Sequence, residues 1–268
     1  MKKIMLVAIV CIVVGIIGIS QTYSKMVDAA EQKETEKVIK SEVIKNVEID
    51  LDAGDIVIQK GSNSSFYVKQ SGDIEKQRVS VNEEGDTLKV KGKMKEGFSF
   101  DVSFLFSRIE TSELTIVVPE RSYQKIKIRS SAGDLTVSDV KSERVEALTL
   151  GGDVEMDRVT AKTVEGSSKA GEVKMKRTSG KVVAKTAAGD VEVMGHDAKY
   201  DLEASSEAGD IDIRLLEKPQ NAVVSGKTYA GEVEIFQTED RNVTFGDGSV
   251  KITGKTAAGD VSIQVNET

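Results

Sequence analysis

The stretch Ala188-Gly189-Asp190-Val191-Glu192-Val193 decides the fold, because close copies of it recur along most of the chain. From Gly133 to Gly259, the central glycines of seven copies are separated by 19, 19, 18, 20, 22 and 28 residues. A nearly constant step of this length is typical of a solenoid, in which each coil stacks on the next. The copies occupy residues 53–58, 132–137, 151–156, 170–175, 188–193, 208–213, 230–235 and 258–263.

Residue types are also fixed around each glycine. Two and four residues after it, every copy has an aliphatic residue or Met, and the residue five before it is mostly small. Residues of one parity share a face of a strand, and this parity breaks at the Gly-Asp step, which indicates a corner between two strands. From the second copy onward, Ser or Thr stands three residues before the glycine: Ser130, Thr149, Ser168, Thr186, Ser206, Thr228 and Thr256.

These patterns predict an all-β protein, a β-solenoid of coils of about 20 residues. Glycine suits the corner because it adopts positive φ without strain. The Ser and Thr hydroxyls are expected to form a buried ladder, each bonded to the coil above or below, while the aliphatic residues fill the interior. No helix is predicted beyond the N-terminal segment.

The acidic residue that follows each glycine is the place where chemistry could reside. In a solenoid these carboxylates line up about 4.8 Å apart, where like charges repel unless something offsets them. One interpretation is that each accepts hydrogen bonds from turn amides and faces water. The alternative is a row of bound cations such as calcium, although the Gly-Gly-x-Gly-x-Asp form of calcium-binding β-rolls is absent. The candidate row is Asp134, Asp153, Glu172, Asp190, Asp210, Glu232 and Asp260, with Asp55 in the first copy.

The N-terminal segment predicts a membrane anchor. Lys2 and Lys3 precede an uncharged run over residues 4–19, and adding residues 20–23 brings the segment near the length that a bilayer span requires. We therefore assign residues 1–23 to a single transmembrane helix with the rest of the chain outside the cytoplasm. The alternative is a cleaved signal peptide, although no Ala-x-Ala site is present. Cys11 lies in mid-span and is not a lipidation site.

Composition excludes several classes of function. One His and one Cys in 268 residues exclude a Cys/His zinc site and an intrachain disulfide. The formal net charge of −7 argues against nucleic acid as a partner. Beyond the anchor the net charge is −9, from 35 basic and 44 acidic residues, and such a body is expected to be repelled by an anionic membrane surface. Residues 24–42, rich in Lys and Glu, are interpreted as a charged linker or short helix.

Residues 43–122 are less regular and are interpreted as an N-terminal β-strand region ahead of the solenoid repeats over residues 123–268. A further alternating stretch places Phe98, Phe100, Phe104 and Phe106 on one face. It is expected to be a strand covering an end or side of the stack, and the alternative is an exposed aromatic face for a lipid or partner. The other predicted strands are residues 47–51, 66–68, 79–81, 87–90 and 113–118, the last ended by Pro119.

The order of these features resembles a known family. The chain has, in order, a lone N-terminal span, a strand-rich segment ending in Ile116-Val117-Val118-Pro119, the stretch over residues 126–135 and the serial Ala-Gly-Asp coils. In this order it is similar to the bacterial "putative adhesin" β-strand-repeat family, a domain of unknown function. Within it, the chain resembles the LiaG-type membrane-anchored proteins of Bacillus-like Gram-positive bacteria. The resemblance implies an extracytoplasmic β-solenoid and a link to an envelope-stress operon, and it supplies no catalytic residues.

The sequence leaves three functions open. The favoured one is a non-catalytic surface scaffold or binding module for envelope proteins or cell-wall polymers, with no cofactor. The second is a β-helix enzyme acting on polysaccharide, but the carboxylates belong to the repeat and form no singular cluster. His196, the only histidine, is interpreted as a surface loop residue without Ser or Cys partners. The third is an envelope-stress regulator, which would require a partner within the membrane because only Met1-Lys2-Lys3 precedes the span.

Overall fold

The computed structural model describes residues 34–72, 77–94 and 112–266. In these residues the chain forms 22 β-strands and no helix, so the prediction of an all-β protein is confirmed. The described residues belong to one compact unit, Glu34–Thr268. Within the described ranges, no helix is long and apolar enough to cross a membrane, and the predicted span lies outside them.

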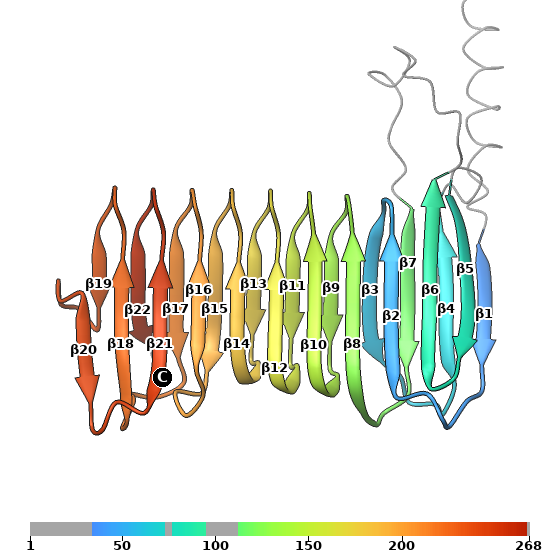
Figure 1. The fold of residues 1–268 in the computed structure, drawn as a ribbon, viewed down its shortest axis with the longest axis horizontal. Coiled ribbons are helices and arrows are strands. Elements are labelled where there is room, and N and C mark those ends of the chain that lie inside the picture. Colours follow the sequence, from blue (N-terminus) through green and yellow to red (C-terminus); the bar gives the residue numbers. More distant parts are fainter. Residues whose placement is uncertain (1–33, 73–76, 95–111, 267–268) are drawn as a thin grey trace, which may run out of the picture. The chain divides into compact units, whose positions relative to one another are not determined.

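The strands form two sheets of 11 strands each, which lie face to face (Figure 1). In the middle of the chain every coil contributes one strand to each sheet, and consecutive coils pair in parallel, in register apart from one local shift in each of two strand pairs. The central strands of sheet A are β9 (Leu135–Ser138), β11 (Val154–Asp157), β13 (Val173–Lys176), β15 (Val191–His196) and β17 (Ile211–Leu215). Those of sheet B are β8 (Ser122–Ser130), β10 (Lys141–Thr149), β12 (Thr160–Ser167), β14 (Ser179–Lys185) and β16 (Leu202–Ser205).

At the N-terminal end the coils are stacked out of sequence order. The first coil, β2 and β3, lies next to β8 and β9, and the later coil of β6 and β7 lies outside it. Three antiparallel strands complete this end, with β4 and β1 in sheet A and β5 in sheet B. The strands are β1 (Thr35–Ile39), β2 (Asn46–Leu51), β3 (Asp55–Lys60), β4 (Phe66–Ser71), β5 (Gln77–Glu84), β6 (Thr87–Met94) and β7 (Glu113–Val118).

The C-terminal end repeats this device. After β17 the chain skips one position in the stack, forms the outer coil of β18 and β19, and then returns to fill the gap with β21 and β22. β20 pairs antiparallel with β18 at the edge of sheet B. The strands are β18 (Ala222–Lys227), β19 (Val233–Ile235), β20 (Asn242–Phe245), β21 (Val250–Lys255) and β22 (Val261–Val265).

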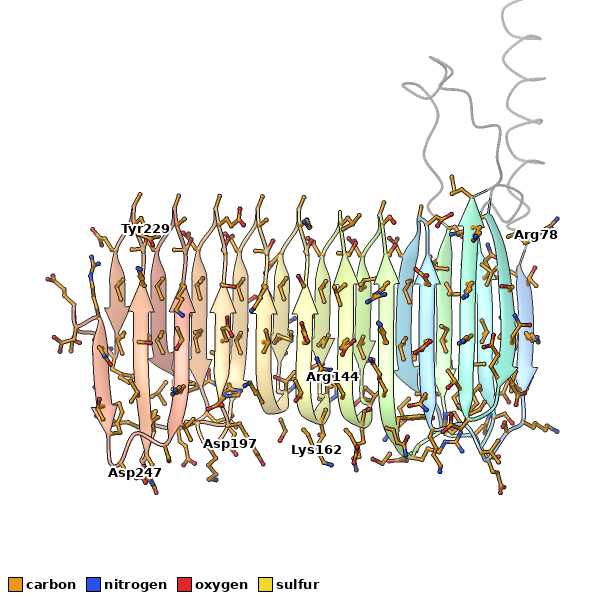
Figure 2. The ribbon with its side chains drawn as sticks, in the orientation of Figure 1. Arg78, Arg144, Lys162, Asp197, Tyr229 and Asp247 are labelled. Atoms are coloured by element: carbon orange, nitrogen blue, oxygen red, sulfur yellow. The ribbon has the colours of Figure 1, made fainter. Side chains whose placement is uncertain are left out.

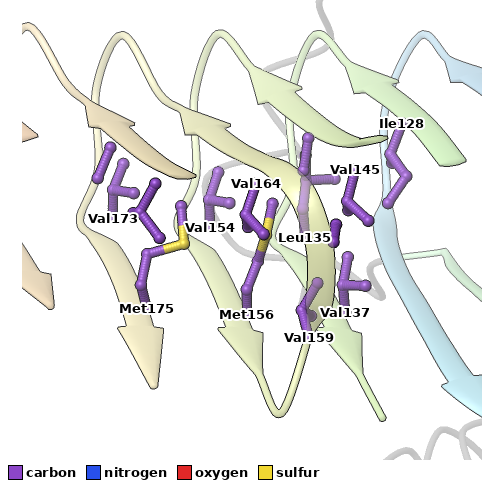
Figure 3. Packing of buried hydrophobic residues seen from close by; sticks show 14 of the residues in the cluster. Ile128, Leu135, Val137, Val145, Val154, Met156, Val159, Val164, Val173 and Met175 are labelled. Atoms are coloured by element: carbon purple, nitrogen blue, oxygen red, sulfur yellow. The ribbon is translucent and has the colours of Figure 1, made fainter. Parts of the chain in front are cut away.

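The core is a continuous apolar layer between the two sheets. The aliphatic and Met residues two and four places after each corner glycine point inward, as Val154, Met156, Val173 and Met175 do in Figure 3. Where the opposite strand has glycine, the facing side chain takes the space: a Cβ at Gly166 would lie 2.5 Å from the Met175 Cε. The small residues five places before the corner therefore leave room for the Met and Val side chains of the opposite sheet.

The interpretation of residues 24–42 as a linker or short helix is wrong for residues 35–39, because they form β1, which pairs with β4 and buries Ile39. The pairing of an otherwise open edge outweighs the helix-favouring Lys and Glu composition. The predicted Phe-rich strand lies outside the described residues. The other strands predicted between residues 47 and 118 are present.

Candidate functional site

Each glycine corner is a close contact between successive coils. Gly152 has a φ of 125°, and a Cβ there would lie 2.3 Å from the Gly133 carbonyl oxygen of the preceding coil. The same approach recurs at Gly171, where the corresponding distance is 2.2 Å. Each corner therefore requires glycine for two reasons: the backbone has a positive φ, and the preceding coil lies too close to leave room for a Cβ.

The predicted hydroxyl ladder is present beneath the corners. From Thr149 onward, each of these buried hydroxyls donates to the carbonyl of the corner glycine in a neighbouring coil, at 2.7–3.1 Å. Ser130, at the first step, bonds instead to Ala132 in its own corner. Because their hydrogens are committed to glycine carbonyls, these serines and threonines are structural groups rather than nucleophiles.

The acidic residues at the corners form a second ladder. In six places an aspartate Oδ1 accepts the backbone N–H of the acidic residue in the neighbouring coil, at 2.7–2.9 Å. In the described corners this ladder is interrupted at Glu172, whose longer side chain lies 3.7 Å from the Lys174 Nζ. These bonds match the interpretation that the carboxylates accept turn amides.

In the candidate cation row, the five aspartates thus each accept one backbone N–H already. No group of three or more metal-ligating side chains that could hold an ion occurs within residues 34–72, 77–94 and 112–266. The row of Asp134, Asp153, Glu172, Asp190, Asp210, Glu232 and Asp260 stays a prediction that a melting experiment can test.

His196 is not a surface loop residue, and that interpretation is wrong. It is the last residue of β15 and is fully buried. Gly195, with a φ of 70°, forms a bulge in the pairing with β17 and turns the imidazole inward. Nε2 lies 2.9 Å from the Tyr200 carbonyl oxygen, and Nδ1 has no partner. Burial lowers the pKa of His196, against weaker raising effects of the Tyr200 hydrogen bond and of Asp197 and Asp201. A buried neutral imidazole without access to solvent is a packing residue.

Charge is distributed unequally over the two sheets. The strands of sheet B contain fifteen lysines and arginines against eight aspartates and glutamates, a net charge of +7. Those of sheet A contain six against eight, a net charge of −2. Seven further acidic residues stand at the corners directly before strands of sheet A. The molecule therefore presents a basic face and an acidic face.

Some cations of the basic face are paired with carboxylates. Glu146 on β10 contacts Arg144 and lies 3.4 Å from the Lys125 Nζ, and the Arg144 guanidinium also lies 3.0 Å from Glu165. Burial raises the pKa of Glu146, but the hydrogen bonds and charges of Arg144 and Lys125 outweigh it and hold the pKa below its usual value. This part of the face is electrostatically satisfied.

Other cations on sheet B lie around a hollow. A hollow of about 180 Å³ is lined by Glu48, Ile49, Asp50, Lys89, Val90, Lys91, Lys127 and Arg129, on β2, β6 and β8. Sequence reasoning missed these residues, because it counted charge over the whole body. Alternate lysines at 89, 91 and 93, and alternate cations at 125, 127 and 129, are the signal that could have found them.

Two further hollows lie where the chain crosses between coils. One of about 120 Å³ is next to the link from β7 to β8, and one of about 330 Å³ is next to the link from β17 to β18. Asp197, a lining residue of the larger hollow, lies at the edge opposite the glycine corners, whereas Tyr229 lies at the corner edge (Figure 2).

Comparison with known families identifies the fold. A family model described as Toastrack DUF4097 matches residues 44–177 and again residues 124–267. The chain belongs to the Toastrack DUF4097 family. The resemblance to the "putative adhesin" repeat proteins is confirmed at this level. The two matches overlap over residues 124–177, within the repeats.

Solved structures with a similar course of the chain include three bacterial proteins. A putative cell adhesion protein from Clostridium sporogenes is 12% identical, with 88% of the Toastrack chain and 100% of that protein covered and a TM-score of 0.45. A putative adhesin from Bacteroides fragilis is 12% identical, with 86% and 96% covered and a TM-score of 0.40. A putative lipid binding protein from Parabacteroides distasonis is 12% identical, with 87% and 97% covered and a TM-score of 0.40. At these values the likeness carries no functional argument. The comparison with curated proteins gives no match.

Proposed function

We propose that the chain is a non-catalytic binding scaffold displayed outside the cytoplasm. The observation that carries this proposal is the separation of charge, which gives sheet B a net charge of +7 in a chain whose total is −7. Long flat sheets with opposite charge are suited to holding partners by complementarity rather than to enclosing a reacting substrate. The absence of catalysis is supported by the Ser and Thr hydroxyls of the ladder, which donate to glycine carbonyls, and by the burial of His196.

The proposal includes attachment to the cell membrane by residues 1–23. It rests on the uncharged run over residues 4–19 behind Lys2 and Lys3. The full chain is then expected in the membrane fraction of lysed cells and to resist extraction by high salt. Recovery of the protein only from the culture medium would contradict an uncleaved anchor.

A LiaG-type role in the envelope-stress response is the finer part of the proposal, and it rests on the order of anchor, strand-rich segment and coils. We expect the amount of the chain to rise when cells are challenged with agents that damage the cell wall or membrane. An unchanged amount, measured by immunoblotting against an unrelated membrane protein, would remove the stress link and leave the binding scaffold intact.

The binding role is tested by crosslinking in living cells. A photoreactive residue replaces Lys127, on the outer face of sheet B, or Glu192, on the outer face of sheet A, in the full-length chain. We expect a discrete adduct from the basic face with an envelope protein or cell-wall polymer, identified by mass spectrometry. Only the free chain at both positions would count against a binding scaffold.

A further inference from the structure

Six cations form two rows on the outer face of sheet B, one on each side of β2. Outward-facing residues alternate with buried ones on both flanking strands, so each row lies on the solvent side. Successive cations in a row are about 7 Å apart, and the two rows are about 10 Å apart, since β2 lies between them. We call this arrangement the β2 trough, formed by Lys89, Lys91 and Lys93 on β6 and by Lys125, Lys127 and Arg129 on β8.

The floor of the trough carries fewer charges than its rims. Glu48 lies level with Lys89 and Lys127, and Asp50 lies level with Lys91 and Arg129. The three strands together contain six cations and two carboxylates, a local net charge of +4. The short side chains of β2 between longer ones account for the hollow of about 180 Å³. The β2 trough is therefore a narrow positive channel along a strand.

Four of the six cations make no ion pair with a described residue. These four are Lys91, Lys93, Lys127 and Arg129, whereas Lys89 contacts Glu84 and Lys125 lies 3.4 Å from Glu146. Glu48 and Asp50 offset only part of the positive charge of the trough. The repulsion among the remaining cations raises the free energy of the folded chain, and an external anion removes it. The unpaired cations thus indicate a ligand rather than a contribution to stability.

We propose that the β2 trough binds a linear polyanion that carries phosphate groups along its chain. Lysine ammonium groups and the Arg129 guanidinium both bind phosphate oxygens, and two rows flanking one strand fit an extended polymer better than a compact ion. Several weak contacts made in succession give a polymer an advantage over its monomer. This proposal deepens the proposed function, since it names the ligand class of the basic face.

The test measures binding of long-chain inorganic polyphosphate to the full-length chain in a neutral detergent. Replacing Lys91→Glu together with Arg129→Glu reverses one cation in each row. Replacing Lys251→Glu together with Lys255→Glu changes the net charge equally on the same face, but on β21, outside the trough. We expect the first pair to weaken binding roughly tenfold or more and the second pair to weaken it much less. Binding should also fall as salt rises.

Four outcomes would overturn the proposal. These are equal losses in the two double variants, binding of monomeric phosphate as tight as that of the polymer, failure of polyphosphate to bind, and binding of phosphatidylglycerol vesicles but not of polyphosphate. If the variants melt close to the parent, their loss of polyphosphate binding is not caused by unfolding. If polyphosphate fails while a photoreactive residue at position 127 still captures a protein, the trough proposal is wrong and the binding scaffold stands.

Discussion

The central coils and the two ends of the stack use the same repeat in different ways. Between β8 and β17 the coils follow one another in sequence order, and each coil contacts only the coils on either side. At both ends an outer coil forms out of order, and a coil distant in sequence fills the position beneath it. The repeat thus encodes the shape of a coil, whereas the connections between coils decide where that coil is placed.

The ends should therefore fail differently from the centre when residues are removed. Ending the chain at Ser249 deletes β21 and β22, with Ile252, Val261 and Ile263, each of which contributes about 1.5–3 kcal/mol through burial. The outer coil of β18 and β19 then loses its pairing with β21 and β22. We expect residues 216–249 to be cleaved in limited proteolysis, and melting no higher than that of a chain ending at Leu215.

The control for this truncation is the chain ending at Leu215, which removes more residues but leaves the central coils in order. If the chain ending at Ser249 melts clearly higher and residues 216–249 stay protected, β18 and β19 have moved into the empty position. The repeat alone would then be sufficient to place a coil.

Substitutions of two neighbouring glycines in one corner test whether the central coils depend on glycine at that corner. Gly152→Ala places a Cβ 2.3 Å from the Gly133 carbonyl oxygen at a φ of 125°, and we expect a loss of about 3 kcal/mol in the free energy of unfolding. Gly151→Ala is the matched control, because a Cβ there meets nothing within 4 Å and every other copy has alanine at this place. Chemical denaturation measures both, and equal losses would show that the corner does not depend on glycine.

We expect the stability of the fold to depend on pH through His196, which lies where the ordered centre meets the C-terminal end. His196 is buried and its folded-state pKa is lowered by burial, so the unfolded chain takes up a proton first as the pH falls below about 6.5. The stabilisation is present above that pH and is lost below it, by at most about 1.4 kcal/mol per pH unit. Melting between pH 7.5 and pH 5.5 should fall less steeply for His196→Asn than for the parent. Parallel slopes would show that the imidazole does not titrate on unfolding.

The hydroxyl ladder gives a smaller effect with its own control. Thr186→Val removes the 2.8 Å hydrogen bond to the Gly171 carbonyl and should cost about 1 kcal/mol. Thr178→Val should be neutral or stabilising, since the buried Thr178 Oγ1 has no partner. Denaturation midpoints measure both variants. A larger loss at Thr178 than at Thr186 would contradict the ladder as a source of stability.

The smallest expected effect is that of metal removal. Because each ladder aspartate already accepts a backbone amide, we expect the melting temperature to be the same with calcium and with EDTA. A clear fall in EDTA, absent after Asp153→Asn and Asp190→Asn are introduced together, would instead support the row of cations.

The sequence predicted the coil and its corner in residue detail, because both follow from local rules of φ, parity and side-chain volume. It did not predict the order of the coils, which depends on pairing between distant strands. A hint was present in the wider steps of 22 and 28 residues around Gly231, where the chain crosses outward and returns. The burial of His196 depends on a bulge at Gly195, and the basic trough on register between β6, β2 and β8. Neither is visible in one coil taken alone.

Because the out-of-order ends close the stack, the number of central coils can vary independently of how each end is closed. Each terminal assembly closes its own end of the stack, so a central unit of about 19 residues can be gained or lost without rebuilding either terminus. Every such change would lengthen or shorten the slab by about 4.8 Å and leave its cross-section unchanged. The length of the stack can therefore change in fixed steps of one coil while both closed ends are kept.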